Sequence, residues 1–148
     1  MAAAIKTISD ALITRLASQV EGLSPQTVAT FSGSLEEFTQ QGRNVPFAGV
    51  ALEEAAYDGL SSDNSIAEEY LSFSLHVLAE DFRGRGYSIE NSYGLIDEIR
   101  DCLMGQTLGL EGLAPISISA VKRDEVSAEH GLAVYIMKIE TWQVRGPS

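Results

Sequence analysis

The chain has little cysteine, few basic residues and no long apolar run. It contains one cysteine, so no internal disulfide can form, which is typical of reducing compartments. Its 10 Lys and Arg stand against 21 Asp and Glu, and the net charge of −11 opposes binding to nucleic acids and anionic membranes. No stretch approaches about 18 uninterrupted apolar residues. Lys6, Asp10 and Arg15 interrupt the N-terminal apolar segment, so neither a membrane span nor a secretory signal is predicted.

Motifs that mark catalytic, metal and cofactor sites are equally scarce. Gly84-Arg85-Gly86 begins a GxGxxG phosphate-binding pattern, but Ile89 stands where the third glycine belongs. A Walker lysine and a GxSxG nucleophile motif are both absent from the sequence. The two histidines, His76 and His130, do not have the spacing of paired zinc ligands. The sequence therefore predicts no catalytic residue, no cofactor and no metal site.

Apolar periodicity predicts two amphipathic helices. Over residues 3–20, apolar residues recur three and four positions apart, at Ile5, Ile8, Leu12, Leu16 and Val20. A second helix is expected over residues 88–104, before Gly105. Its inward stripe would consist of Ile89, Tyr93, Ile96, Ile99 or Arg100, and Leu103. Gly94 inside this helix should cost about 1 kcal/mol relative to alanine.

Runs of β-branched, aromatic and alternating residues predict five strands. They cover residues 27–31, 45–52, 70–79, 116–126 and 132–144, and the last two should form a long hairpin. The third is the clearest, because its apolar residues alternate with polar ones at Leu71, Phe73, Leu75 and Val77. Three connecting segments are also predicted: an exposed loop over 56–65, a flexible link over 82–86 (FRGRG), and a short helical turn at Ser34 and Glu37.

This order of elements predicts one domain over residues 1–148 with an α+β fold. Only one pair of strands is separated by a full helix, so the sheet should be mixed and mostly antiparallel. Two amphipathic helices can cover one face of such a sheet, and we expect both to pack there. The other face should carry small polar side chains, namely Ser72, Ser74, His76, Ser117 and Ser119.

Charge is distributed unevenly along the chain. Between Asn44 and Phe82 there are eight acidic residues and no Lys or Arg, and Arg83 and Arg85 then follow together. One interpretation is an acidic loop that serves solvation. The other is a contact between identical copies, in which the arginines of one subunit meet the acidic loop of the next and a ring closes. Under that hypothesis the interface residues are Arg83, Arg85, Glu53, Glu54, Asp58 and Asp63.

Five stretches together carry a further pattern. They are AAIKTISDALITRL, VPFAGVAL, YLSFSLHVLAEDFRGRG, YGLIDEIRDCLMGQTLGLEGLAPISI and the closing GLAVYIMKIETW. This pattern resembles the Mu-like tail proteins of bacteriophages and prophages, a family of minor tail proteins related to tail terminators. The resemblance extends over nearly the full chain, and it is a pattern of structural elements rather than a catalytic signature.

The resemblance implies a non-enzymatic structural protein of a phage tail, a defective prophage or a tail-like bacteriocin. Such a subunit would form a homo-oligomeric ring, expected to be a hexamer, that caps the head-proximal end of the tail tube. Its partners would be tail tube and sheath proteins and head–tail connector or neck proteins. It would assemble in the bacterial cytoplasm and reside in the virion tail. DNA would cross the ring without specific binding, because acidic residues such as Glu53, Glu54 and Asp58 would repel it from the channel wall.

Two other function classes are compatible with the sequence. A small intracellular enzyme could use Cys102 or His76 in a pocket, although a cysteine beside Leu103 is also typical of a small buried core residue. A stand-alone adaptor could use the serine-rich sheet face and bind a partner strand by edge addition. The first alternative predicts a monomer with a deep pocket, and the second predicts a 1:1 complex with another protein.

Overall fold

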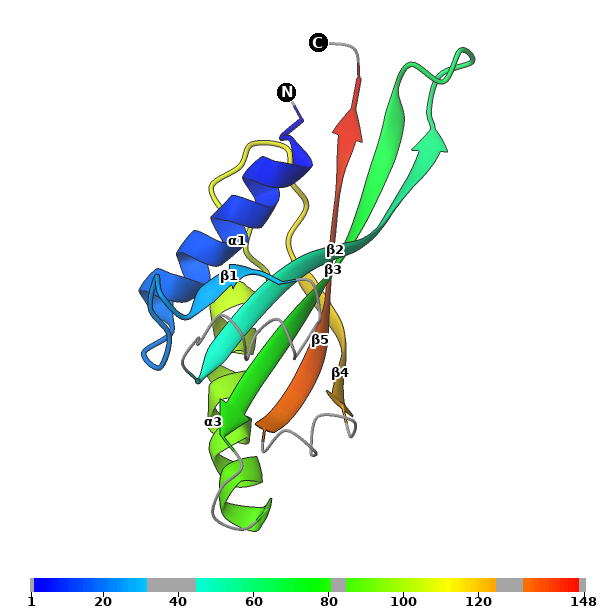
Figure 1. The fold of residues 1–148 in the computed structure, drawn as a ribbon. Coiled ribbons are helices and arrows are strands. Elements are labelled where there is room, and N and C mark those ends of the chain that lie inside the picture. The colour runs from blue at the N-terminus through cyan, green and yellow to red at the C-terminus, as the bar shows by residue number, and fades with distance from the viewer. Residues whose placement is uncertain (1, 32–44, 81–84, 125–131, 147–148) are drawn as a thin grey trace.

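The fold is a five-stranded sheet with two helices on one side (Figure 1). The computed structural model describes residues 2–31, 45–80, 85–124 and 132–146. In these ranges the elements are α1 (Ile5–Gln19), β1 (Val28–Thr30), β2 (Phe47–Gly59), β3 (Ala67–Glu80), α3 (Arg85–Leu103), β4 (Ser117–Asp124) and β5 (Leu132–Arg145). The predicted turn at Ser34 and Glu37 lies outside the described residues, as do Arg83 and His130.

The strand order in the sheet is β1-β2-β3-β5-β4. β1 and β2 run parallel, whereas the β2–β3, β3–β5 and β4–β5 pairs are antiparallel. This arrangement confirms the prediction of an α+β fold with a mixed, mostly antiparallel sheet. The pairing of the last two predicted strands, now β4 and β5, is confirmed as well.

Helix α1 forms where the apolar periodicity predicts it. Ile8, Leu12 and Leu16 are buried on one side of the helix, while Lys6 and Asp10 form an exposed ion pair of 2.7 Å on the other. Such an i,i+4 pair adds only a few tenths of a kcal/mol, about 0.3–0.5, so the buried stripe is what holds the helix.

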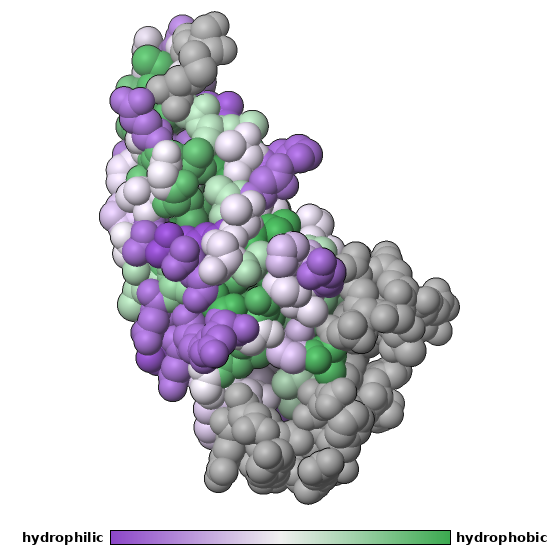
Figure 2. Space-filling view, turned by 90° about the vertical axis from the view of Figure 1, so that its left-hand side faces the viewer, coloured by the Kyte–Doolittle hydropathy of each residue, from purple (hydrophilic) through white to green (hydrophobic). Residues whose placement is uncertain are grey.

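Viewed from the side that carries α1, the surface has separate hydrophilic patches with hydrophobic residues exposed between them (Figure 2).

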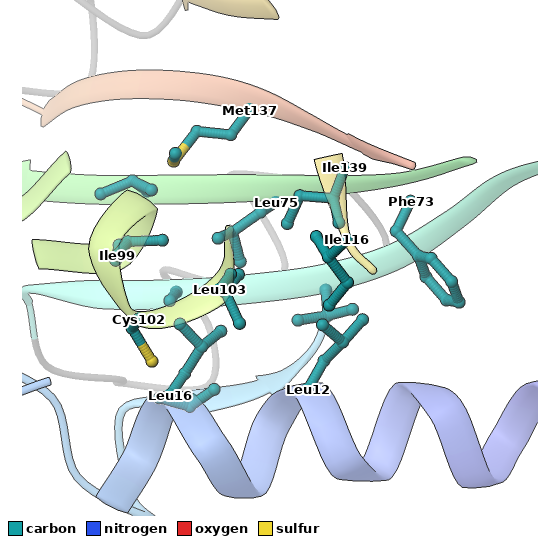
Figure 3. Close-up of a cluster of buried hydrophobic side chains, with 14 of the residues drawn as sticks. Leu12, Leu16, Phe73, Leu75, Ile99, Cys102, Leu103, Ile116, Met137 and Ile139 are labelled. Carbon is teal, nitrogen blue, oxygen red and sulfur yellow. The ribbon is translucent and has the colours of Figure 1, made fainter. Parts of the chain in front are cut away.

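The main core lies between the two helices and the covered face of the sheet (Figure 3). Leu12 and Leu16 of α1 point toward Ile99 and Leu103 of α3 and toward the strands. Full burial of each large apolar side chain contributes roughly 1.5–3 kcal/mol, and this layer therefore fixes both helices to the sheet. The strands supply alternate residues of β3 and β5, which are Leu71, Phe73, Leu75, Val77, Tyr135, Met137 and Ile139.

Helix α3 differs from the prediction at its start and in its inward stripe. It begins at Arg85, so the predicted flexible link is already helical from that residue, ahead of the expected start at residue 88. Glycine-rich composition is only a weak guide, because tertiary packing overrides helix propensity. Tyr93, predicted to face inward, is 53% exposed, and Arg100 is exposed as well. Among the side chains of α3 from residue 92 onward, Ser92, Ile99, Cys102 and Leu103 are buried and Ile96 is partly buried, while the predicted inward residue Ile89 lies among the side chains that are not described.

The predicted loop over residues 56–65 is confirmed for residues 60–65 and wrong for residues 56–59, because β2 continues to Gly59 and forms a hairpin with β3 that extends past the helices (Figure 1). Residues 56–59 pair with residues 67–70, and the turn is confined to residues 60–66. Continuous cross-strand pairing thus outweighs the turn-forming composition. Gly59 ends the strand where a Cβ would lie 2.2 Å from Oδ1 of Asn64, so a side chain there would displace the Asn64 amide. We call residues 56–70 the projecting hairpin.

A buried polar network ties the projecting hairpin to the N-terminal segment. The Glu69 carboxylate is 1% exposed and accepts hydrogen bonds from Gln143 Nε2 at 2.7 Å and Tyr57 Oη at 2.8 Å. Arg145 Nε lies 3.2 Å from its Oε2, and Gln143 Nε2 also donates to the Ala3 carbonyl at 2.8 Å. Burial alone would raise the pKa of Glu69, but the hydrogen bonds and the Arg145 charge lower it below its ordinary value. The carboxylate is therefore ionised at neutral pH.

Two β-bulges lie at the same level of the sheet, in the strands β2 and β4 that flank the β3–β5 pair. One is at Glu53 in β2 and the other at Ser119 in β4. The β2 bulge is next to residues 72–73 of β3, and the β4 bulge lies at the same level on the other side of β5. A bulge bends its strand and increases the local twist. The two bulges therefore separate the part of the sheet that packs on the helices from the projecting hairpin, which leans away from them (Figure 1).

Candidate functional site

The sheet face turned away from α1 and α3, here called the open face, carries a groove of about 540 Å³. Its walls come from β2, β3, β4 and β5, so distant segments of the sequence meet in it. The predicted polar face is present, because Ser72, Ser74, His76 and Ser119 all line the groove. Ser117 lies one row farther along β4, where it pairs with Glu140. Lys122 and Lys138 complete the polar lining, and Ala120 and Ile136 are apolar parts of it.

The bulge in β2 aims Glu53 into this groove. An extra residue in one strand releases its side chain from the regular alternation of faces. The Oε1 atom of Glu53 accepts a hydrogen bond of 2.6 Å from Ser74 Oγ, and Ser74 is only 5% exposed. The Glu53 carboxylate, predicted from the sequence as an interface residue, thus has a partner within its own chain.

His76 lies where the groove meets a small second core on the open face. The ring of Phe31 stands 5.2 Å from the imidazole, edge to face, and covers Gly49 on the neighbouring strand. Burial lowers the pKa of His76 below its ordinary value, against the opposing charges of Glu53 and Asp124. The imidazole is therefore mainly neutral at pH 7 and packs as an aromatic side chain. The second core consists of Phe31, Phe47, Leu78 and Val134.

Cys102 is on the other side of the sheet from His76, so the two cannot form a catalytic pair. Its side chain belongs to the main core (Figure 3), and its Sγ lies 3.8 Å from the Arg15 carbonyl oxygen. Arg15 Nε in turn donates to the Cys102 carbonyl at 2.7 Å. Burial raises the pKa of the Cys102 thiol, despite the opposing Arg15 charge. A buried thiol of raised pKa is a poor nucleophile, and this position is that of a core residue.

Lys122 and Lys138 form a basic site in the groove of an otherwise acidic protein. Lys138 pairs with Ala120 across the β4–β5 ladder, and Lys122 pairs with Ile136. The two lysines are thus diagonal neighbours on one face of adjacent strands, with their Cα atoms roughly 7–8 Å apart. Both are exposed, and in the described ranges neither has a carboxylate within 4.0 Å.

Carboxylates and aromatic rings occupy the same face beyond the bulges. Glu54 pairs with Ser72, Asp58 with Glu68, and Tyr70 with Trp142. The Tyr70 hydroxyl donates a hydrogen bond to Glu68, which raises the pKa of Tyr70; burial and the charges of Glu68 and Asp58 act in the same direction. Tyr70 is 41% exposed and Trp142 is 42% exposed, so this part of the face presents aromatic surface within an acidic surround.

The remaining predicted interface residues lie at opposite ends of the molecule. Asp63 is in the turn of the projecting hairpin, where its Oδ1 accepts hydrogen bonds from Ser61 Oγ at 2.8 Å and Ser65 Oγ at 2.7 Å. The bonds from Ser65 and Ser61 lower the pKa of Asp63 to about 2, so its first role is to shape the turn. Arg85 is the first residue of α3, at the far end from this turn (Figure 1). Within one copy, the start of α3 at Arg85 is therefore far from Asp63, and Arg83 lies outside the described residues.

Sequence reasoning missed the lysine pair and the exposed aromatic residues of the open face. A usable signal existed in β5, where Lys138, Glu140 and Trp142 alternate with the buried Met137, Ile139 and Thr141. Lys122 could not be placed in the same way, because the bulge at Ser119 shifts the alternation of β4.

Comparison with known proteins does not assign the chain to a family. No protein-family model matches the chain, and no curated protein matches it significantly. The resemblance to Mu-like tail proteins therefore stays a prediction. In the part of the chain that the structure describes, no three His, Cys, Asp or Glu side chains are grouped as metal ligands. No helix in those ranges is long and apolar enough to cross a bilayer.

Proposed function

We propose that this chain is a structural subunit of a phage tail or tail-like particle, in which identical copies assemble into a ring. The observation that carries this proposal is the projecting hairpin, which extends the sheet past its own helices. Its outer residues have little of the chain to pack against, as the run of exposed positions from Ala56 to Gly59 indicates. A strand pair built this way is typical of a protein whose surface is completed by neighbouring molecules.

Exposed apolar side chains on and beside the hairpin support an assembly role. On the open face of this part of the sheet, Tyr70 is 41% exposed, Trp142 42% and Val144 46%, and the cross-strand register places the three near one another. Apolar groups gathered on one part of a surface commonly mark protein–protein contacts. The acidic residues between them would keep the free subunit soluble before assembly.

The family resemblance extends this proposal to a specific place in the particle. A terminator ring, hexameric in the family resembled, would cap the head-proximal end of the tail tube, stop its growth and offer a docking surface to the head or neck. The acidic residues Glu54 and Asp58 are exposed, as a channel lining that repels DNA would require. Glu53 contributes less to such a lining, because it is bonded to Ser74.

The two rival functions have less support. An enzyme using Cys102 would need a reactive thiol, and this thiol is buried in the main core with a raised pKa. An enzyme using His76 would rely on an imidazole that packs against Phe31 and whose pKa burial lowers. Strand addition at the β4 edge would have to overcome the bulge at Ser119 and the charges of Lys122 and Arg123. Bulges and basic side chains are devices that discourage pairing at a sheet edge.

Mass measurement tests the proposal directly. Size-exclusion chromatography with light scattering should give a mass of about six subunits, alone or after addition of tail tube protein, and electron microscopy should show closed rings. The protein should also co-purify with tail particles from the producing strain. A chain that stays monomeric under all these conditions and is absent from purified tails would contradict the proposed function.

A further inference from the structure

The open face is divided into two zones of opposite charge. Lys122 and Lys138 form what we call the basic zone, and they share the groove with the Glu53 carboxylate, which is hydrogen-bonded to Ser74. Beyond the bulges the same face carries the acidic zone, which consists of Glu54, Asp58, Glu68 and Glu140. The cross-strand register fixes both zones on this face, because Glu54 and Glu140 both pair with Ser72, whose side chain lines the groove.

Neither zone is neutralised within the described part of the chain. The ion pairs formed there are Lys6–Asp10, Arg100 with Asp97 and Asp101, and Arg145–Glu69, so none involves either zone. The carboxylates of Glu54, Asp58 and Glu140 have no hydrogen-bond donor in the same ranges, whereas Glu68 accepts one from Tyr70. Charges of both signs are thus left free to face another molecule.

The shapes of the two zones are complementary as well. The basic zone is in a groove with Ile136 and Ala120 in its wall, which gives it apolar surface to cover. The acidic zone extends onto the projecting hairpin and surrounds the exposed rings of Tyr70 and Trp142. Aromatic side chains that enter an apolar groove are the usual centre of a protein interface, while charges around them determine which surfaces meet.

We propose that the acidic zone of one copy of this chain docks on the basic zone of a second copy, with Tyr70 and Trp142 against the groove. This inference rests on the proposed function, because it names the surfaces through which identical subunits contact one another. It replaces the sequence-based pairing of Arg83 and Arg85 with a pairing through Lys122 and Lys138. The net charge of −11 repels copies from each other, so a local contact of opposite sign is what permits association.

A charge-swap experiment tests this contact. One variant carries Lys122→Glu with Lys138→Glu, and the other carries Glu54→Lys, Asp58→Lys and Glu140→Lys, which reverses the sign of the acidic zone. Each variant alone presents two zones of like sign, so we expect its self-association constant to fall at least roughly tenfold relative to wild type. An equimolar mixture of the two restores opposite signs at the contact and should regain the wild-type mass. Sedimentation velocity and light scattering measure each mass.

Matched controls separate the contact from net charge. Lys6→Glu with Arg100→Glu changes net charge as much as the lysine variant does, and Asp10→Lys with Asp97→Lys and Glu98→Lys matches the acidic variant. All five control positions are exposed on the helices, away from the open face. These controls should keep the wild-type mass, and circular dichroism should show that every variant is folded. Added salt should weaken the wild-type association.

The outcomes distinguish the docking contact from the proposed ring. Three results would each overturn the docking contact and leave the ring proposal standing. Both charge variants could keep the wild-type assembly, the mixture could fail to restore it, or the control variants could lose it as well. Charge-dependent association that stops at two copies supports the docking contact and overturns the ring. A wild-type chain that never self-associates overturns both.

Discussion

The two halves of the sheet differ in the kind of side chain that they bury. In the half that carries the helices, inward positions such as Leu75, Val77 and Met137 are apolar and fully buried. In the half that forms the projecting hairpin, the same face carries Glu69 and Gln143, each 1% exposed but hydrogen-bonded. Apolar packing stabilises at any pH, whereas a buried carboxylate stabilises only while it is ionised. The helix-covered half is thus the source of stability, and the hairpin is the part whose geometry depends on polar contacts.

The largest effect should come from truncating a side chain in the helix-covered half. Leu75→Ala removes a fully buried side chain between Val50 of β2 and Met137 of β5 and leaves a cavity under α1 and α3. We expect the free energy of unfolding to fall by about 2–5 kcal/mol. Urea denaturation followed by circular dichroism measures it. Leu60→Ala is the matched control, because Leu60 is 54% exposed at the end of the hairpin, and it should cost less than about 0.5 kcal/mol. Equal losses in the two variants would refute the division of the sheet into a stabilising half and a projecting half.

A second, smaller effect should appear on the open face of the helix-covered half. A Cβ at Gly49 would lie 2.2 Å from Cβ of Phe31, so Gly49→Ala must displace the ring that covers the second core. Forcing atoms into a packed site costs roughly 1–3 kcal/mol. Thermal unfolding measures the loss, and adding Phe31→Gly, which removes that Cβ together with the ring, should remove most of the extra penalty in a double-mutant cycle.

Gly94→Ala is the control for that substitution and should act in the opposite direction. A Cβ there meets nothing within 4 Å, so only helix propensity changes. The variant should be more stable than wild type by about 1 kcal/mol. A Gly49→Ala that unfolds like wild type would show that the close contact of Phe31 with β2 does not exist in solution, and a destabilised Gly94→Ala would show that the space around Gly94 is not open.

Local patterns predicted the covered face of this sheet well. The alternation of Leu71, Phe73, Leu75 and Val77 and the stripe of α1 each depend only on residues within one element. Such periodicities follow from backbone geometry and do not need knowledge of the partner element. The α+β class followed from the order of elements for the same reason.

Features that depend on pairing between distant strands could not be predicted in this way. The length of the projecting hairpin was missed because Asp58 and Gly59 have turn-forming composition, while the ladder with β3 continues through them. The bulges at Glu53 and Ser119 have no sequence signature here, yet they decide which side chains enter the groove. Lys122 and Lys138 become neighbours only through the β4–β5 register. The residues of the candidate site are therefore brought together by the pairing of distant strands, whereas the core residues can be read from the periodicity within each element.

The smallest stability effect should come from the polar network of the projecting hairpin, and it should depend on pH. Glu69→Gln keeps the shape of the side chain but removes the charge that faces Arg145, so we expect a loss of about 1 kcal/mol at pH 7. The folded-state pKa of Glu69 lies below its ordinary value of 4.5. Its ionised form therefore stabilises the fold above pH 4.5, and that contribution disappears as the pH falls through the folded-state pKa.

The pH profile of this variant separates a charge effect from a packing effect. The difference in unfolding free energy between wild type and Glu69→Gln should be constant from pH 7 down to about pH 5 and should shrink below pH 4.5. Glu98→Gln, on the exposed side of α3, is the matched control and should show no difference at any pH. A gap that persists unchanged into acid would mean that Glu69 acts through shape alone. The projecting hairpin would then be held by packing, as the helix-covered half is, and the contrast between the two halves would fail.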